Sequence, residues 1–386
     1  MPRLFIGNFA LEQTLSRRGT LPQSLKRLES ELAFAWLAVA NDGDAIYFPE
    51  TVDATEWERL QTLAQCQIRI ATNLSHSEWR GFEMVPWGWT PPLRRLAKDL
   101  NWKAPGPDPA IVKTVNSRIF GWEIEKELGI ALPGTAVIHS LEELRTAIKR
   151  SDEDPWCWVL KTPLSQAGRG QMRGCGRLLN SAQLGWIKKR LQEGRVLILE
   201  PWLRKTREFG VLWDIPRDGP PQLLQITELL TCSKGGYLGT RFPGFRSGTN
   251  WFQELFNAQR TAALKVQETG YHGPLAIDAM DFVQQNGESA LRPLQDLNAR
   301  WSMGRIAWEW RKKLAPASNS PQGLRVCEES PIEDFLALSP SMVGGMASRH
   351  RLWWTSWNSD FDVLAHSEKA DSTGESPAKR GESQGR

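Results

Sequence analysis

The chain has 386 residues, of which 40% are hydrophobic and 24% are charged, a composition typical of a globular protein with room for two or three domains. Its formal net charge of +4 is too small to indicate nucleic-acid binding by itself. No apolar run in the sequence approaches the roughly 20 residues that cross a bilayer, and the short apolar run after Arg3 predicts no secretory signal.

The cysteines are scattered, odd in number and without a CxxC pair: Cys66, Cys157, Cys175, Cys232 and Cys327. This pattern predicts reduced thiols in a cytoplasmic protein, with neither a zinc site nor a disulfide framework. The 19 tryptophans are interpreted as filling core and interface space, with stacking on a ligand as the alternative.

Residues 1–105 are predicted to form a small α/β unit. Short apolar strands are expected at 4–6, 45–48 and 68–70, and helical spacing of apolar residues predicts a helix over 22–39. This alternation indicates parallel pairing of the strands.

A Pro- and Gly-rich break at 104–109 ends that unit. A helix is expected over 117–128, and Ser140 with Glu143 forms a capping-box pattern that begins another. Strands are then predicted at 156–161, 196–200, 208–213, 222–230, 275–282 and 291–299. The Ser-, Gly-, Lys- and Glu-rich tail 367–386 is predicted to be disordered.

The first chemical signal is a lysine at the end of an apolar strand. Strand alternation places Lys161 on the same face as Val159, and a loop of small residues with Ser165, Gly168 and Gly170 follows. Glycines let a backbone approach phosphate oxygens closely. Because the lysine precedes the glycines, the segment is not a GxxxxGK[ST] P-loop. An exposed lysine before an ordinary surface loop is the alternative.

The second signal is an apolar strand that ends in an acidic residue and an extended hinge. Glu200 is followed by Trp202 and Leu203, and Glu208 lies shortly beyond. Such a hinge offers a backbone donor and acceptor to an adenine edge, and a later carboxylate can accept from both ribose hydroxyls. A strand end with solvated charges is the alternative.

The third signal is a set of oxygen ligands on two strands. Asp278 ends one apolar strand, and alternation places Asp296, Asn298 and Arg300 on one face of the next. Carboxylate and amide oxygens suit Mg²⁺, and Arg300 could hold a phosphoryl or carboxylate group in a forked contact. An exposed polar strand face is the alternative.

In this order, the motifs around Lys161, Glu200, Asp278 and Asp296 resemble the ATP-grasp superfamily, in particular its D-alanine ligase-like members. The resemblance covers about residues 105–310. It implies an α/β (α+β) protein in which an N-terminal Rossmann-like domain precedes a two-lobed ATP-grasp fold.

The implied domains are a pre-ATP-grasp domain at 1–105, a small lobe at 106–200 and a large lobe with the metal site at 201–345. A Trp-rich packing segment at 346–366 and the tail would follow.

The resemblance implies ATP and Mg²⁺ as cofactors, with Mn²⁺ as a substitute. Carried over by position, the nucleotide would be bound by Arg118, Lys161, Ser165, Gly168, Gly170, Glu200, Trp202, Leu203 and Glu208. The metal ligands would be Asp278, Asp296 and Asn298, and Arg300 and Lys161 would be catalytic. Arg118 stands where the family usually has lysine and Asp296 where it has glutamate. Ala276 replaces the D-alanine ligase-like arginine, which argues against a plain D-alanine ligase.

The implied reaction is activation of a carboxylate as an acyl phosphate, followed by attack of an amine or thiol. A glycine-rich loop with Lys234, Tyr237 and Arg241 is expected to border the substrate pocket; a flexible surface loop is the alternative. The expected partners are small-molecule or peptide substrates, with neither nucleic acid nor membrane, and a homodimer is allowed. Alternative functions are a small-molecule kinase, a non-catalytic nucleotide-binding protein and a nucleic-acid-binding module, the last suggested only by basic runs that are more simply solvated helix faces.

Overall fold

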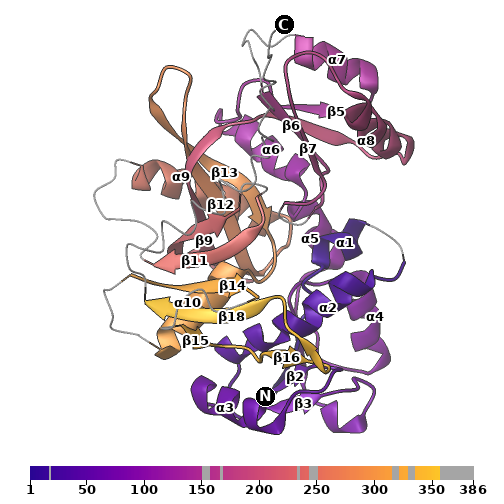
Figure 1. Ribbon diagram of the computed structural model, residues 1–386, viewed down its shortest axis with the longest axis vertical. Helices are drawn as coiled ribbons and strands as arrows, with labels where there is room; N and C mark the ends of the chain where they lie inside the picture. The colour runs from indigo at the N-terminus through magenta and orange to yellow at the C-terminus, as the bar shows by residue number, and fades with distance from the viewer. Residues whose placement is uncertain are drawn as a thin grey trace, which may run out of the picture.

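The computed structural model describes residues 1–16, 19–149, 157–165, 168–232, 235–242, 251–314, 321–328 and 335–356. These residues form a mixed α/β structure with three main sheets. The N-terminal domain lies at the lower end of the view in Figure 1, a small lobe lies at the upper end, and the largest sheet lies between them. No described helix is long and apolar enough to span a membrane.

The N-terminal sheet is parallel, as predicted, with strand order β3-β2-β1-β4. Its strands are β1 (Arg3–Ile6), β2 (Ala45–Tyr47), β3 (Arg69–Ala71) and β4 (Glu83–Pro86). The accompanying helices are α1 (Leu11–Ser16), α2 (Gln23–Leu32), α3 (Ala54–Ala64) and α4 (Pro91–Asp99), with short 3₁₀ segments η1 (Ala33–Ala38) and η2 (Ser77–Trp79).

The single helix predicted over 22–39 is divided. The α-helix ends at Leu32 and the chain continues as η1, all of whose side chains are buried. Only one face of an amphipathic surface helix is buried. Because η1 is buried on every side, its local geometry is set by tertiary packing. One such contact is that of the Phe5 and Trp36 rings, with centroids 4.9 Å apart.

The small lobe is an antiparallel sheet of order β5-β8-β6-β7. Its strands are β5 (Ala136–Ile138), β6 (Cys157–Lys161), β7 (Gln171–Cys175) and β8 (Leu197–Pro201), covered by α7 (Leu141–Lys149) and α8 (Ser181–Gln192). Trp158 and Leu160 lie in a core of its own. The predicted helix start is confirmed, since Ser140 Oγ accepts from the Glu143 N–H at 3.1 Å. Helices α5 (Pro109–Val115) and α6 (Arg118–Glu127) precede this lobe.

The large lobe is an antiparallel sheet of order β13-β12-β9-β10-β11-β14-β18-β15. Its strands are β9 (Arg204–Ile215), β10 (Gln222–Thr231), β11 (Tyr237–Phe242), β12 (Gly273–Val283), β13 (Ser289–Asn298), β14 (Gln322–Cys327), β15 (Leu336–Ala337) and β18 (Arg351–Ser356). Helices α9 (Phe252–Glu268) and α10 (Met303–Leu314) and a small hairpin of β16 (Met342–Val343) and β17 (Met346–Ala347) complete it. The six strands predicted after residue 155 all exist, but β4, β5, β7, β11 and the C-terminal strands were not predicted.

The large lobe shares one hydrophobic core with the N-terminal domain. Trp36 meets Trp301 at 5.2 Å between ring centroids, with the planes at 80°. At the other edge, Trp353 and Trp354 on β18 are 5% and 6% exposed, and β18 pairs with β14. The predicted packing role of these two tryptophans is confirmed, whereas Trp357 and the tail lie outside the described residues.

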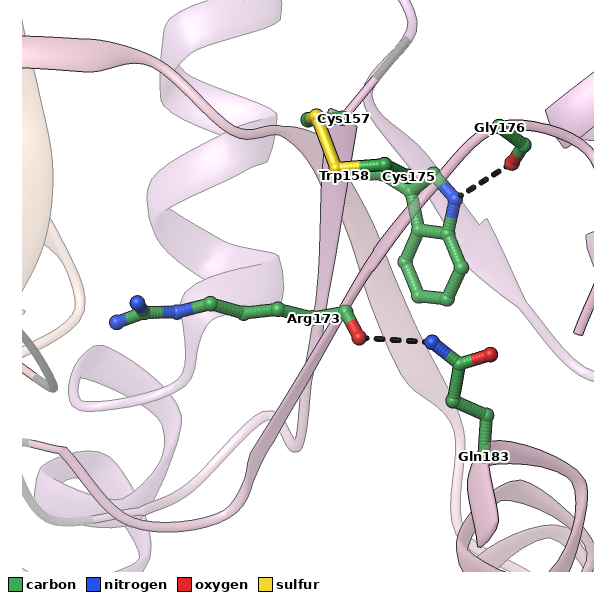
Figure 2. The surroundings of a disulfide bond; sticks show 6 residues. All are labelled: Cys157, Trp158, Arg173, Cys175, Gly176 and Gln183. Atoms are coloured by element: carbon green, nitrogen blue, oxygen red, sulfur yellow. Dashed lines mark hydrogen bonds between the residues drawn. A yellow bond between two sulfur atoms is a disulfide. The ribbon is translucent and has the colours of Figure 1, made fainter. Parts of the chain in front are cut away.

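The prediction of five reduced cysteines is wrong. Cys157 and Cys175 are paired across β6 and β7 with Cα atoms 4.0 Å apart, and they form a disulfide (Figure 2). No CxxC pattern announces this bond, because strand pairing, not sequence spacing, brings these residues together. Two further hydrogen bonds hold β7 and the residue after it. Trp158 Nε1 on β6 donates to the Gly176 carbonyl at 3.1 Å, and Gln183 Nε2 on α8 donates to the Arg173 carbonyl at 2.9 Å.

We expect the denatured, unreduced protein to contain three titratable thiols, those of Cys66, Cys232 and Cys327, because the other two cysteines are bonded to each other. A thiol assay before and after reduction checks this, and mass spectrometry of peptides identifies the bridge. Five titratable thiols before reduction, in protein kept under air, would contradict the assignment.

Candidate active site

Two adjoining cavities lie where the three parts of the molecule meet. The first, of about 170 Å³, lies between the small-lobe sheet and the large sheet. The second, of about 390 Å³, lies between the large sheet and the N-terminal domain. Both are lined by Asp278, Asp296, Arg118 and Tyr237, so the two spaces meet at the predicted metal ligands.

Most of the predicted site residues come together here. The first cavity is lined by Arg118, Lys161, Ser165, Gly168, Glu200, Trp202, Leu203, Glu208, Tyr237, Asp278 and Asp296, and the second adds Asn298 and Arg300. Strand alternation on β6 is as predicted, because Val159 and Lys161 face the cavity. Gly170 lies at the loop's far end, where its carbonyl accepts from the Thr162 N–H at 2.9 Å.

Arg241 is not brought to either cavity. Its guanidinium instead forms a forked ion pair with Glu228, at 2.7 to 2.9 Å, across the β10–β11 pair. The sequence could not show this because it does not reveal which residue of β10 lies opposite Arg241 in the sheet. Lys234 lies outside the described residues.

The centre of the site is a pair of opposed carboxylates. Asp278 on β12 and Asp296 on β13 are direct cross-strand partners, a position in which like charges repel. Burial, and then the neighbouring Asp296, raise the pKa of Asp278 to about 7. Asn298 Nδ2 offsets part of this by donating to Asp278 Oδ2 at 3.1 Å.

Arg118 connects this pair to the small lobe. Its guanidinium lies 2.9 Å from Asp296 Oδ1, and its Nη1 donates to the Thr162 carbonyl at 2.9 Å and to Ser165 Oγ at 2.7 Å. It is the first residue of α6. One arginine therefore contacts both the loop after β6 and a predicted metal ligand.

A buried ionic network holds Lys161. Its Nζ lies 2.7 Å from Glu200 Oε2, and Glu200 also accepts from Arg292 at 3.1 and 3.2 Å. Arg292 is 3% exposed and donates to Glu125 on α6 at 2.9 and 3.2 Å. Burial alone would raise the pKa of Glu200, but Arg292 and Lys161 outweigh it and hold that pKa well below its usual range.

Sequence reasoning missed Arg292 and Glu125. Burial raises the pKa of Glu125 despite Arg292, and the two residues are 167 positions apart. The one available signal was an arginine placed within the apolar run 290–294 of β13, where a buried charge must find a partner. The network joins α6, β6, β8 and β13, and so fixes the small lobe's lysine relative to the large lobe.

The predicted hinge leaves β8 as an extended segment. The Trp202 N–H donates to the Cys157 carbonyl at 2.8 Å, and the Arg173 guanidinium lies 3.6 Å from the centre of the Trp202 ring. Beyond the hinge, Glu208 accepts from Lys205 Nζ at 2.6 Å and from the Thr231 hydroxyl.

Arg300 lies at the second cavity, just past the end of β13. Its Nε donates to Glu12 Oε1 at 2.8 Å, and its Nη2 donates to Asn298 Oδ1 at 2.9 Å. Sequence reasoning did not identify Glu12, which comes from α1 of the N-terminal domain. The site is therefore built from all three parts of the chain.

The donors fit a divalent cation of the magnesium type. Asp278 and Asp296 would supply hard oxygen ligands, and Asn298 would supply its amide oxygen, which now accepts from Arg300 Nη2. Mg²⁺ needs only one or two carboxylates when water and phosphate complete its octahedron. Within the described ranges, no group of three or more His, Cys, Asp or Glu side chains gathers as a metal cluster. A cation here would therefore depend on a ligand from outside the protein as well, such as a phosphate group.

We expect Asp278→Asn to stabilise the nucleotide-free protein at pH 8, because the wild-type carboxylate is ionised there in an unfavourable place. The folded-state pKa of Asp278, about 7, exceeds its ordinary value of 3.8, so the folded state binds the extra proton between these values. Wild-type stability relative to the variant should therefore fall as pH rises from about 4 to about 7, and then stay constant. Denaturant titrations at several pH values measure this.

Adding MgATP at pH 8 should stabilise the wild type more than the variant. The variant lacks one carboxylate of the predicted metal site, and a ligand that binds only the folded state adds less stability when it binds less tightly.

In the pH experiment, a difference in stability between the two proteins that does not change with pH would contradict the assignment of this pKa to Asp278.

Comparison with solved structures identifies the fold. No family model matches the sequence, and no curated protein matches it. Among solved structures, N5-carboxyaminoimidazole ribonucleotide synthetase from Thermus thermophilus matches with a TM-score of 0.55 at 15% identity, covering 98% of this chain and 99% of that chain. Biotin carboxylase from Campylobacter jejuni, solved as a β-γ-ATP complex, matches at 0.58 and 12% identity, covering 96% and 90%.

The N5-carboxyaminoimidazole synthase from Aspergillus clavatus, in complex with ADP and 5-aminoimidazole ribonucleotide, matches at 0.51 and 12% identity, covering 96% and 98%. These neighbours are ATP-grasp carboxylate–amine ligases. At such low identity the likeness concerns the fold, and it extends over the N-terminal domain as well as both lobes. The fold expected from the sequence motifs is confirmed: the chain has the mixed α/β ATP-grasp fold of these solved structures.

Proposed function

We propose that the chain is an ATP- and Mg²⁺-dependent ligase that activates a carboxylate as an acyl phosphate and joins it to an amine. The observation that supports this most strongly is the opposed pair Asp278 and Asp296, placed in a cleft with Lys161 and Arg118. An opposed pair of carboxylates beside cationic side chains in one cleft suits a metal–triphosphate complex. The similar structures solved with ADP or an ATP analogue support the same nucleotide for this chain.

The nucleotide would lie in the first cavity. The hinge backbone near Trp202 and Leu203 would meet the adenine edge, and Glu208 would accept the ribose hydroxyls in place of its present donors Lys205 and Thr231. Lys161 and Arg118 would contact the phosphates. Arg118 is now paired with Asp296, so it would exchange one anion for another when the nucleotide enters.

The loop after β6 would cover the phosphates. Gly170 has φ of +64°, and a Cβ there would lie 2.6 Å from Ser165 Cβ and 2.7 Å from Thr162 Oγ1. Glycine is therefore required for the loop to turn back on itself this tightly. Closing it over the phosphates would exclude water, which otherwise hydrolyses an acyl phosphate.

In the reaction, a carboxylate oxygen of the substrate would attack the γ-phosphorus while the bond to the bridging oxygen breaks and ADP leaves. The amine would then attack the acyl carbon, forming the C–N bond as phosphate departs with the electrons of the C–O bond and a proton leaves the nitrogen. Asp278, Asp296 and Asn298 would hold Mg²⁺, which neutralises phosphate charge when bound. Lys161, Arg118 and Arg300 would stabilise the remaining negative charge.

The test is release of ADP and phosphate from ATP and Mg²⁺ with pooled carboxylic acids and amines, followed by mass spectrometry of the products. We expect Lys161→Ala to lower kcat by roughly 10²–10³-fold, because a charge-stabilising donor at the phosphates is lost. Lys188→Ala is the matched control, since Lys188 is exposed on α8, and its activity should equal that of the wild type.

Phosphate release should require both the acid and the amine. A phosphorylated small molecule formed without any amine would instead identify a kinase. Binding of ATP with no turnover against the whole panel would identify a nucleotide-binding protein without activity.

A further inference from the structure

One wall of the first cavity carries a cation stacked on an aromatic ring. Arg173 on β7 and Trp202 just after β8 both line this cavity, and the Arg173 guanidinium lies 3.6 Å from the centre of the Trp202 ring. Trp202 is 38% exposed, so a molecule that enters the cavity can meet the pair. A guanidinium held on an indole ring keeps its charge in a fixed place. A fixed cation beside a ring suits a nucleotide, which offers both phosphates and a flat base.

The Cys157–Cys175 disulfide holds both members of this pair. The Trp202 N–H donates to the Cys157 carbonyl at 2.8 Å, and Arg173 lies two residues before Cys175 on the same strand. The side chains of Arg173 and Cys175 therefore leave β7 on the same face, and Figure 2 shows the Arg173 side chain pointing away from the Trp158 ring. The bond thus links the strand that carries Arg173 to the residue that anchors the Trp202 backbone.

The end of β7 that carries this bond lies at the edge of the sheet. Among the described strands, β7 pairs with β6 alone. The loop after Lys161 joins the two strands at one end, and the disulfide joins them at the opposite end. The ends of edge strands open at a low cost in free energy, so loss of the bond would let Arg173 move off the Trp202 ring. The hydrogen bonds from Trp158 and Gln183 would still keep β7 in the sheet.

A reductant can reach the bond, because Cys175 is exposed and Cys157 is half-buried. A thiolate of a small dithiol would attack Cys175 Sγ, and the electrons of the S–S bond would leave on Cys157 Sγ. The second thiol of the reductant would then attack the mixed disulfide and release Cys175. The protein gains two thiols, and the dithiol, which supplies both protons and both electrons, becomes a cyclic disulfide.

From these observations we propose that the Cys157–Cys175 disulfide is a redox switch for nucleotide binding: when formed, it positions Arg173 on Trp202 at the first cavity, and its reduction lowers the affinity for a nucleotide. Arg173 contacts the ligand, and the two cysteines are positioning residues that act through it. The choice of a nucleotide as the ligand rests on the proposed ligase function, but the switch is measured as binding and needs no turnover.

The test is equilibrium dialysis of the full chain with MgADP, before and after reduction by dithiothreitol, with thiol titration to establish the redox state. We expect reduction to weaken binding by about tenfold, the effect of one displaced cation–π contact and its charge. A double variant with Cys157→Ala and Cys175→Ala should bind MgADP like the reduced wild type and should not respond to dithiothreitol. Cys327→Ser is the matched control, because Cys327 lines neither cavity, and it should behave like the wild type in both states.

Arg173→Met separates the proposed route from a general loosening of the small lobe. This variant should bind MgADP as weakly as the reduced wild type, and reduction should change its affinity by less than about twofold, since the two changes remove the same contact. Arg173→Lys, which keeps a cation able to lie over the ring, should recover part of both the affinity and the redox response.

Equal affinity of the oxidised and reduced wild type for MgADP would overturn the switch and leave the nucleotide site intact. A tenfold effect of reduction that persists in Arg173→Met would also overturn it, because the bond would then act on the lobe as a whole. If no form of the protein binds MgADP, the nucleotide site itself is wrong, and both the proposed ligase function and the switch are rejected.

Discussion

Asp278 and Asp296 stand directly opposite one another on neighbouring antiparallel strands, and the surrounding structure is organised to accommodate that repulsion. One carboxyl has a pKa raised to about 7. Asn298 donates to it, and Arg118 pairs with the other. Each of these contacts partly offsets the electrostatic repulsion between the two carboxylates, a pairing that is unfavourable in a sheet. A divalent cation bound between them would offset the repulsion more completely, which is why we regard this pair of carboxylates as functional.

The buried network behind Lys161 has a different role. Arg292, Glu200 and Glu125 are almost fully buried, and ions removed from water are costly unless paired closely. Here the pairing crosses from α6 and β8 to β13. It gives the small and large lobes a fixed contact at the floor of the cleft. Lys161, Glu200 and Arg292 all line the cavity, and Lys161, at 12% side-chain exposure, is the most exposed member of the network.

The sequence predicted the parts of this site that depend on local pattern. Strand alternation placed Lys161 on the cavity face of β6 and placed Asp296 and Asn298 on one face of β13, opposite Asp278, which lies in the middle of β12 and not at its end. The motif order also predicted the ATP-grasp fold. The side-chain placements share one cause, because a strand's side-chain period of two is visible in the sequence itself, whereas the fold was implied by the resemblance to a known superfamily.

What the sequence did not predict depends on contacts between distant segments. Glu125 and Arg292 meet only when α6 packs on β13, and Glu12 meets Arg300 only when the N-terminal domain docks. The Cys157–Cys175 disulfide follows from the β6–β7 register, and Arg241 turned to Glu228 instead of the cavity. Residues 33–38 form a 3₁₀ segment because tertiary burial on all sides overrides the amphipathic pattern.

The central claim is that Asp278, Asp296 and Asn298 converge on a metal that is bound together with a nucleotide. Anomalous diffraction from crystals grown with Mn²⁺ and a non-hydrolysable ATP analogue tests it directly. The account predicts a manganese peak between these three side chains, with the analogue's phosphates between them and Lys161. A nucleotide bound elsewhere, or a peak remote from these oxygens with the cleft left empty, would contradict it.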